Sequence, residues 1–269
     1  MNGLSISRAW DEAKATIARE GQLLAAVALA LVVLPQIILA VVGVPTDMQA
    51  TPVSQLVYIA AVLLGFVAEI ALNRLAIGPS VRVADAIAQG FARVLPVFIV
   101  LAVVMLVVAI VAVLLALLLA AAGMGVLPSA GRAPPASLIL LLVLLTALAT
   151  AIFQLVFPVA AMETGNPVRL FVRALQLARG HYWRLLAFIL TVFVALGVIA
   201  AAVQLGVGSV VLLVVGRPNP GSLSALLLGL VAGAVQAVFT VIVAVMQARI
   251  YVQLAGGGEA QASVPSSGT

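Results

Sequence analysis

The stretch NPVRLFVRALQLARGHYWRLLAFILTVF, residues 166–193, contains the features from which we predict the fold. Asn166 and Pro167 are typical of a helix start, because asparagine accepts from unpaired backbone N–H groups and proline has no donor to lose there. Gly180 frees the backbone where that helix is expected to end, and the apolar run after it is long enough to cross a bilayer. One face of the predicted helix carries the polar residues Arg169, Arg173 and Gln176, and the opposite face is apolar.

We interpret this pattern as an amphipathic helix in the membrane interface, a glycine joint and then a membrane span, a unit that we call an elbow. The predicted fold class is an all-α integral membrane protein with six transmembrane helices and three elbows. It forms one domain over residues 1–255, followed by a disordered polar tail over 256–269. The predicted segments are elbow 5–20 with spans 22–43 and 53–74, elbow 79–90 with spans 94–122 and 138–162, and elbow 167–180 with spans 184–215 and 222–248.

The three elbows suggest an internal repeat. Superposing the second on the third at Gly90 and Gly180 matches alanine, leucine and phenylalanine positions on either side, whereas the first, with its joint at Gly21, matches loosely. A three-fold repeat and a general likeness between interfacial helices both explain the match. Within the first span, Pro35 is expected to kink the helix.

Composition places the chain in a membrane, because 65% of its residues are hydrophobic, 8% are charged and its mean hydropathy is +1.33. The absence of cysteine excludes disulfides and thiolate catalysis, and a single histidine excludes a histidine metal cluster. We therefore expect no cofactor and no metal. The net charge of +5 lies beside the apolar runs, so anionic lipid rather than nucleic acid is the expected partner.

The basic residues predict the orientation. Of the 13 lysines and arginines, all except Arg132 and Arg217 fall on the elbow side of the predicted spans. The positive-inside rule then places both termini and all three elbows in the cytoplasm. The residues expected to contact lipid headgroups are Arg82, Arg93, Arg169, Arg173, Arg179, Trp183 and Arg184.

Two carboxylates fall near the ends of predicted spans: Glu69, with Asn73 one turn further on, and Glu163. An acidic group at the edge of the hydrocarbon region is costly, so it marks either a functional position or an ion pair. We favour an ion pair, because arginines are plentiful at that depth. The candidate partners are Arg82, Arg169 and Arg173.

Polar and small residues within the spans have two interpretations each. The glutamines line a hydrophilic path or form hydrogen bonds between helices, and we favour hydrogen bonds. The small-residue stripe permits close helix packing, either within the chain or between copies in a homo-oligomer. The glutamines are Gln154, Gln204, Gln236 and Gln247, and the stripe comprises Ala225, Gly229, Gly233 and Ala237.

The run RALQLARGHYWR, residues 173–184, preceded by Pro158 and Glu163, resembles the membrane domain attached to some bacterial glycerophosphoryl diester phosphodiesterases and the YciC-type inner-membrane proteins. The resemblance implies a multispan bundle in the bacterial cytoplasmic membrane. It does not imply phosphodiesterase activity, because the soluble catalytic domain has no counterpart in these 269 residues. The matching residues are Arg173, Leu177, Gly180, Trp183 and Arg184.

Our first hypothesis is a non-enzymatic membrane protein whose elbows bind or organise anionic lipid; the sequence identifies no protein partner. The alternative is a transporter or flippase of a lipid or small amphiphile. A polar cavity reaching the middle of the bilayer favours this alternative, and a bundle packed shut favours the first hypothesis. An intramembrane enzyme is the third option, which a close grouping of Glu69, Glu163 and His181 would favour.

Overall fold

A computed structural model of the chain describes residues 5–43, 51–78, 81–122, 136–217, 219 and 221–262. All regular elements in these ranges are helices, and six of the helical segments are long and apolar enough to cross a membrane. The chain is therefore an all-helical, multi-pass membrane protein, as predicted. The elements are α1 (Ile6–Ala28), the π-helical turn η1 (Leu29–Val33), α2 (Leu34–Val42), α3 (Pro52–Ile77), α4 (Val83–Ala121), α5 (Ala136–Phe153), α6 (Val156–Met162), α7 (Pro167–Ala178), α8 (Tyr182–Val214) and α9 (Leu223–Ala262).

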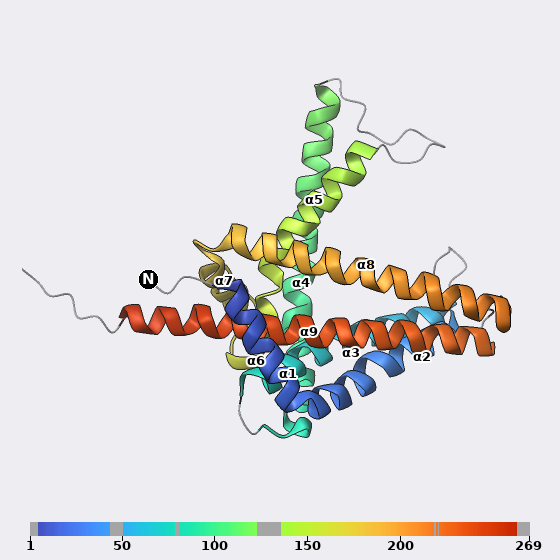
Figure 1. Ribbon diagram of the computed structural model, residues 1–269. Coiled ribbons are helices and arrows are strands. Elements are labelled where there is room, and N and C mark those ends of the chain that lie inside the picture. Colours follow the sequence, from blue (N-terminus) through green and yellow to red (C-terminus); the bar gives the residue numbers. More distant parts are fainter. Residues whose placement is uncertain are drawn as a thin grey trace, which may run out of the picture.

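Helix α9 is the centre of the bundle, with α1, α2, α3 and α8 packed along it (Figure 1). The start of α1 meets the far part of α9, where the backbone N–H of Ser5 donates to Gln253 Oε1 at 3.2 Å. At the opposite end, the N–H of Gly221 donates to the carbonyl of Val41 at 3.0 Å and joins the α8–α9 connection to α2. We call these two ends the α1 end and the α2 end.

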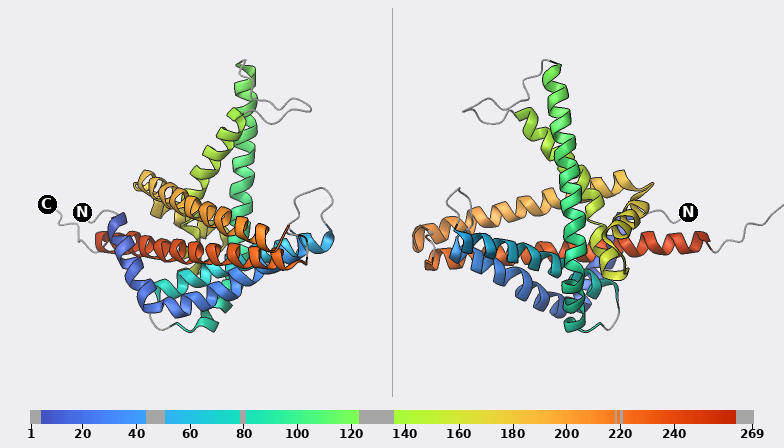
Figure 2. Two further views of the ribbon diagram at one scale, coloured as in Figure 1. Left: turned by 45° about the vertical axis from the view of Figure 1, so that its right-hand side comes forward. Right: turned by 180° about the vertical axis from the view of Figure 1, so that it is seen from behind.

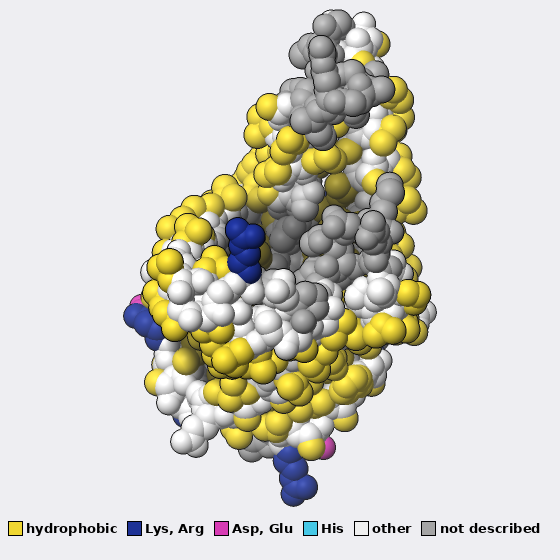
Figure 3. Space-filling model, turned by 90° about the vertical axis from the view of Figure 1, so that its right-hand side faces the viewer, with side chains coloured by type: hydrophobic (Ala, Val, Ile, Leu, Met, Phe, Trp, Pro, Cys, Tyr) yellow, Lys and Arg dark blue, Asp and Glu magenta, His cyan; other side chains and the backbone are white. Residues whose placement is uncertain are grey.

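Helices α4 and α5 form a hairpin that rises steeply away from the other spans (Figure 2). It is attached through α3, which contacts α4, and through α8, which contacts α5. The connection between α4 and α5 lies in residues 123–135, outside the described residues, as does Arg132. Seen from the α2 end, the sides of the molecule show mainly hydrophobic side chains, and charged side chains are few (Figure 3), as expected of helix sides that face lipid.

Two prolines account for the breaks in the helices. Pro35 has no N–H to donate to the carbonyl four residues earlier, and the preceding turn, η1, widens so that Leu34 N–H bonds to Leu29 instead. Pro158 likewise has no N–H to donate to the carbonyl of Gln154, and at Gln154 the predicted fourth span separates into α5 and α6. The expected kink at Pro35 is present, and the break at Gln154 was not predicted.

The structure corrects two of the three predicted glycine joints. The backbone remains helical through Gly21 inside α1 and through Gly90 inside α4, because one glycine costs a helix only about 1 kcal/mol. Of the three predicted joints, only Gly180, where φ is +83°, separates two helices, α7 and α8. The bend of the first segment lies at η1, after the predicted joint. The three-fold repeat stays a prediction.

Gly90 is a packing position instead of a joint. A Cβ placed on it would lie 2.7 Å from the carbonyl oxygen of Val67 and 2.9 Å from Val67 Cγ1. Glycine therefore allows α4 to cross directly over the backbone of α3. The signal that we interpreted as flexibility is a close helix crossing.

The small-residue stripe of α9 packs within the chain. A Cβ on Gly229 would lie 2.5 Å from Ala40 Cβ, and one on Gly233 would lie 3.1 Å from Val33 Cα. Ala225 and Ala237 are buried on the same helix. The stripe thus packs α9 against η1 and α2. Of the two interpretations of the stripe, the structure shows packing within the chain.

The predicted polar tail begins too early. Helix α9 continues through Gly256 to Ala262, because nothing interrupts its backbone hydrogen bonding at Gly256. Residues 263–269 lie outside the described residues, as do Pro79 and Ser80 at the start signal of the second predicted elbow.

Candidate functional site: a polar cleft between the spans

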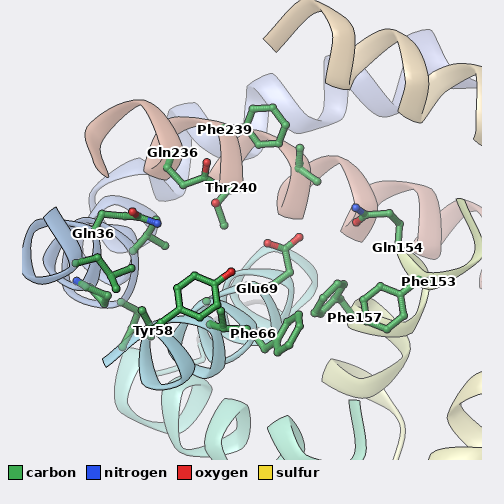
Figure 4. Close-up of a pocket in the computed structure, with 18 of the residues that line it drawn as sticks. Gln36, Tyr58, Phe66, Glu69, Phe153, Gln154, Phe157, Gln236, Phe239 and Thr240 are labelled. Atoms are coloured by element: carbon green, nitrogen blue, oxygen red, sulfur yellow. The ribbon is translucent and has the colours of Figure 1, made fainter. Parts of the chain in front are cut away.

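A cleft of about 440 Å³ lies between α2, α3, α8, α9 and the α5–α6 break (Figure 4). Gly65 and Phe66 of α3 line it near the middle of Pro52–Ile77, and Phe239 and Thr240 of α9 line it near the middle of the apolar stretch Leu223–Gly256. The volume is within the range of small-molecule sites. The cleft therefore lies at mid-length of the helices that form the bundle.

Among the described residues that line the cleft, Glu69 is the only charged one. Its carboxylate points into the open space (Figure 4). No described arginine or lysine forms a salt bridge with it, which differs from the pairing that we expected for this residue. Its hydrogen-bond partner is the side chain of Gln247.

Five neutral polar residues accompany Glu69 around the cleft. Within the described part of the chain, four of them have side chains that form no hydrogen bond, so their polar groups are available to a ligand or to water. Tyr58 is 45% exposed and lies toward the α2 end. The four are Gln36, Tyr58, Gln236 and Thr240.

A hydrogen-bonded layer closes the cleft toward the α1 end. Asn73, which is completely buried, donates to Gln247 Oε1 at 3.1 Å, and Gln247 donates in turn to Gln154 Oε1. The layer joins α3, α9 and the α5–α6 break. Both interpretations of the glutamines therefore apply: Gln154 and Gln247 bond between helices, and Gln236 lines the cleft. Gln204 is exposed on α8.

Arg249 forms a clamp between helices behind this layer, on the side of the α1 end. One terminal nitrogen of Arg249 donates to Thr16 Oγ1 and to the carbonyl of Ala76, each at 2.7 Å, and so ties α9 to α1 and α3. The basic group satisfies backbone and hydroxyl acceptors rather than a carboxylate. It closes the bundle at the α1 end.

Two groups of aromatic rings flank the cleft. Phe157 contacts Phe66 at 5.8 Å between ring centroids and Phe153 at 5.2 Å, on the side of Glu69. Across the cleft, Phe193 and Phe239 pair at 5.2 Å. Sequence reasoning missed these rings and Tyr58. The available signal was their position, since Phe66 precedes Glu69 by one turn and Phe153 and Phe157 flank Gln154.

Glu163 has the ion-pair environment that Glu69 lacks. Arg173 Nε lies 3.0 Å from Glu163 Oε1, and the Tyr251 hydroxyl donates to the same oxygen at 3.1 Å. The pair is partly exposed, with 41% of the Arg173 side chain and 34% of the Glu163 side chain accessible. Arg173 was one of the partners suggested by the sequence.

Helix α7 packs its apolar stripe on the protein core, with Leu170 and Ala174 buried. An amphipathic helix in the membrane interface would place its apolar face in lipid, whereas at these two positions the face is buried in protein. The predicted headgroup residues fall into two groups: Arg82, Arg169, Arg179, Trp183 and Arg184 are exposed, whereas Arg93 and Arg173 are half-buried.

The described residues contain no group of three or more histidine or acidic side chains that could hold a metal ion. His181 does not line the cleft, so it does not join Glu69 there. Glu69 and His181 therefore do not form the grouping that would favour an intramembrane enzyme, and the non-enzymatic role stays a prediction.

No family model, no curated protein and no solved structure matches the chain. The resemblance to the phosphodiesterase-associated membrane domains stays a prediction.

Proposed function

We propose that the protein is a non-enzymatic carrier that binds a small amphiphile in the cleft and moves it across the membrane. The observation that supports this proposal is the cleft at mid-length of the spans, with a carboxylate and unpartnered polar side chains facing it. Polar groups at that depth are costly and are retained where a bundle binds or conducts a polar ligand. Of the two hypotheses drawn from the sequence, a polar cavity favours transport.

The helix breaks support the same function. Transport folds commonly form their binding sites where spans are interrupted, because freed backbone groups and mobile half-helices then face the substrate. Here η1 and the Gln154 break both border the cleft. Closure at the α1 end and an exposed Tyr58 toward the α2 end correspond to a carrier open on one side.

Filling the cleft tests the proposal. A Cβ on Gly65 would meet no atom within 4 Å, so Gly65→Trp adds bulk to the cleft without a clash near the backbone. Gly206→Trp is the matched control, because Gly206 on α8 has equally open surroundings and does not line the cleft. The assay follows a dansylated alkylammonium, a dansylated alkanoate and a fluorescent phosphatidylcholine across proteoliposome membranes.

We expect the unmodified protein and Gly206→Trp to accelerate at least one probe roughly tenfold over protein-free liposomes, and Gly65→Trp to lose this acceleration. Equal transport by the two variants would contradict a path through the cleft. Failure of all three probes to cross faster with the protein than without it would contradict the carrier proposal.

A second candidate function is the organisation of anionic lipid at the α1 end. The exposure of Arg169, Arg179 and Trp183, the last at 74%, supports it. A surface arginine contributes about 1 kcal/mol of attraction to anionic lipid. The combined variant Arg169→Gln, Arg173→Gln and Arg179→Gln should co-purify with severalfold less anionic lipid, and unchanged lipid content would count against this role.

The same basic residues support a bacterial inner-membrane location with the α1 end in the cytoplasm. The chain has no cysteine, so single-cysteine variants report exposure cleanly. In spheroplasts, a membrane-impermeant maleimide should label Arg217→Cys and leave Arg179→Cys unlabelled until the membrane is opened. The reverse pattern would invert the orientation.

A further inference from the structure

We propose that the cleft selects a monovalent organic cation, with the cationic head at Glu69 and the apolar body between the two aromatic groups. This inference rests on the carrier function and specifies its substrate class. Three properties of the cleft support it: a carboxyl group without a salt-bridge partner, aromatic walls, and no cationic side chain among the described residues that line it.

The first property is the carboxyl group of Glu69. Among apolar spans a carboxyl group either takes up a proton or, as a carboxylate, needs an opposite charge or several hydrogen-bond donors to compensate it. Gln247 supplies one amide contact, but that side chain is shared with Asn73 and Gln154 in the closing layer. The described cations are engaged elsewhere or lie outside the lining. A ligand with a positive charge supplies the missing partner.

The second property is the aromatic lining near that carboxylate. Phe66 lies one turn before Glu69 on α3 and contacts Phe157, which contacts Phe153. Aromatic faces attract ammonium groups within about 6 Å of the ring centroid, and the attraction is stronger away from water. Phe193 and Phe239, on the other side, provide an apolar surface for the body of the ligand.

The third property excludes other ligand classes. The remaining polar lining residues, Gln36, Tyr58, Gln236, Thr240 and Gln154, are all uncharged. A phosphate or carboxylate in the ligand would therefore find no cation and would lie near Glu69, a like charge. Anionic amphiphiles and phospholipid headgroups are disfavoured, whereas an amine or quaternary ammonium with an apolar body is favoured.

The test measures equilibrium binding to the full-length protein in nanodiscs made of neutral lipid. The probe is radiolabelled tetraphenylphosphonium, a permanently charged organic cation. Tetraphenylmethane-like neutral analogues serve as competitors, and radiolabelled tetraphenylborate, the anion of nearly the same shape, is titrated in a separate experiment because it forms an insoluble salt with the cation. We expect saturable binding of the cation, with the neutral analogue and the anion at least tenfold weaker.

Glu69→Gln, which removes the charge and keeps the shape, should weaken cation binding at least tenfold, and Glu69→Asp should retain part of it. Glu163→Gln is the matched control, since it makes the same change outside the cleft and should leave binding unaltered. Phe66→Leu should weaken binding severalfold. Thermal unfolding of each variant separates loss of binding from loss of fold.

Equal cation binding by Glu69→Gln and the unmodified protein would overturn the proposal. Equal binding of the neutral analogue would overturn it too, and would indicate a site for uncharged amphiphiles. Neither result affects the carrier function if Gly65→Trp still blocks transport while Gly206→Trp does not. Loss of cation binding and loss of transport are thus measured separately.

Discussion

Helices α3 and α9 are packed tightly toward the α1 end and separated by a cleft toward the α2 end. From Val67 to Ala76, nearly every residue of α3 is buried, as is nearly every residue of α9 from Val243 to Tyr251. Between residues 55 and 66 of α3, all described and all partly or fully exposed, the side chains face the cleft or the surroundings. Glu69 lies at the boundary between the tightly packed part and the cleft.

The difference shows how one pair of helices can hold its geometry and also bind a ligand. At the packed end, contacts between the two helices and the amide layer fix the distance between α3 and α9. In the other half, α9 is held by α2 through its glycines, so α3 does not need to fill the space. The stability of the fold and the binding site therefore depend on different residues, so a substitution can change one without changing the other.

The largest expected difference is between two glycines, Gly90 at the packed end and Gly65 in the cleft. Gly90→Leu forces α4 away from Val67 and should reduce the free energy of unfolding by about 3 kcal/mol, since overpacking against backbone has no simple relief. Gly65→Leu meets no neighbour and should be neutral or stabilising by up to about 1 kcal/mol, because it removes a helical glycine. Denaturant titration in mixed micelles, followed by circular dichroism, measures both. Similar losses would show that the cleft half is also closely packed.

The Arg249 clamp should have the next largest effect. Arg249→Leu removes two charge-assisted hydrogen bonds, to Thr16 and Ala76, and should cost about 2 kcal/mol. Arg184→Leu, at an exposed arginine, is the control and should change stability by less than about 0.5 kcal/mol. The same titration applies. Equal effects would mean that Arg249 does not tie the three helices together.

The sequence predicted the spans well, because long apolar runs have few alternatives to membrane helices. It also predicted the small-residue packing of α9, since spacing of four places those residues on one face. The joints at Gly21 and Gly90 were wrong for a physical reason. A glycine is compatible with both a hinge and a close helix crossing, and only the neighbouring helix decides between them.

The cleft was only partly predictable. Glu69, Gln154, Gln236 and Gln247 were recognised as unusual, but their partners depend on helices distant in the sequence. The break at Gln154 had a local signal, because Pro158, four residues later, has no N–H to donate to the carbonyl of Gln154. The steep angle of the α4–α5 hairpin had no such signal. Apolar composition indicates that a helix lies in lipid, but it does not determine the angle between that helix and its neighbours.

A smaller effect is expected for the amide layer that closes the cleft. A double-mutant cycle of Asn73→Ala and Gln247→Ala should give a coupling of about 1 kcal/mol, typical of hydrogen bonds between membrane helices. The same cycle between Asn73→Ala and Gln236→Ala should give a value close to zero, because Gln236 lines the cleft beyond the layer. Unfolding titrations of the single and double variants provide the cycle. Comparable couplings would place Gln236 in the layer.

The smallest expected effect concerns the ion pair of Glu163 and Arg173, and it completes the contrast between the two carboxylates. Both side chains are more than a third exposed to solvent, so water screens their attraction. A cycle of Glu163→Gln and Arg173→Gln should therefore give a coupling below about 0.5 kcal/mol that decreases further in 1 M salt, where charges are screened within about 3 Å. A coupling above about 1 kcal/mol that persists in salt would show that the membrane shields this pair. Glu163 would then share the low-dielectric surroundings of Glu69, and the two carboxylates would differ only in having a cationic partner within the chain.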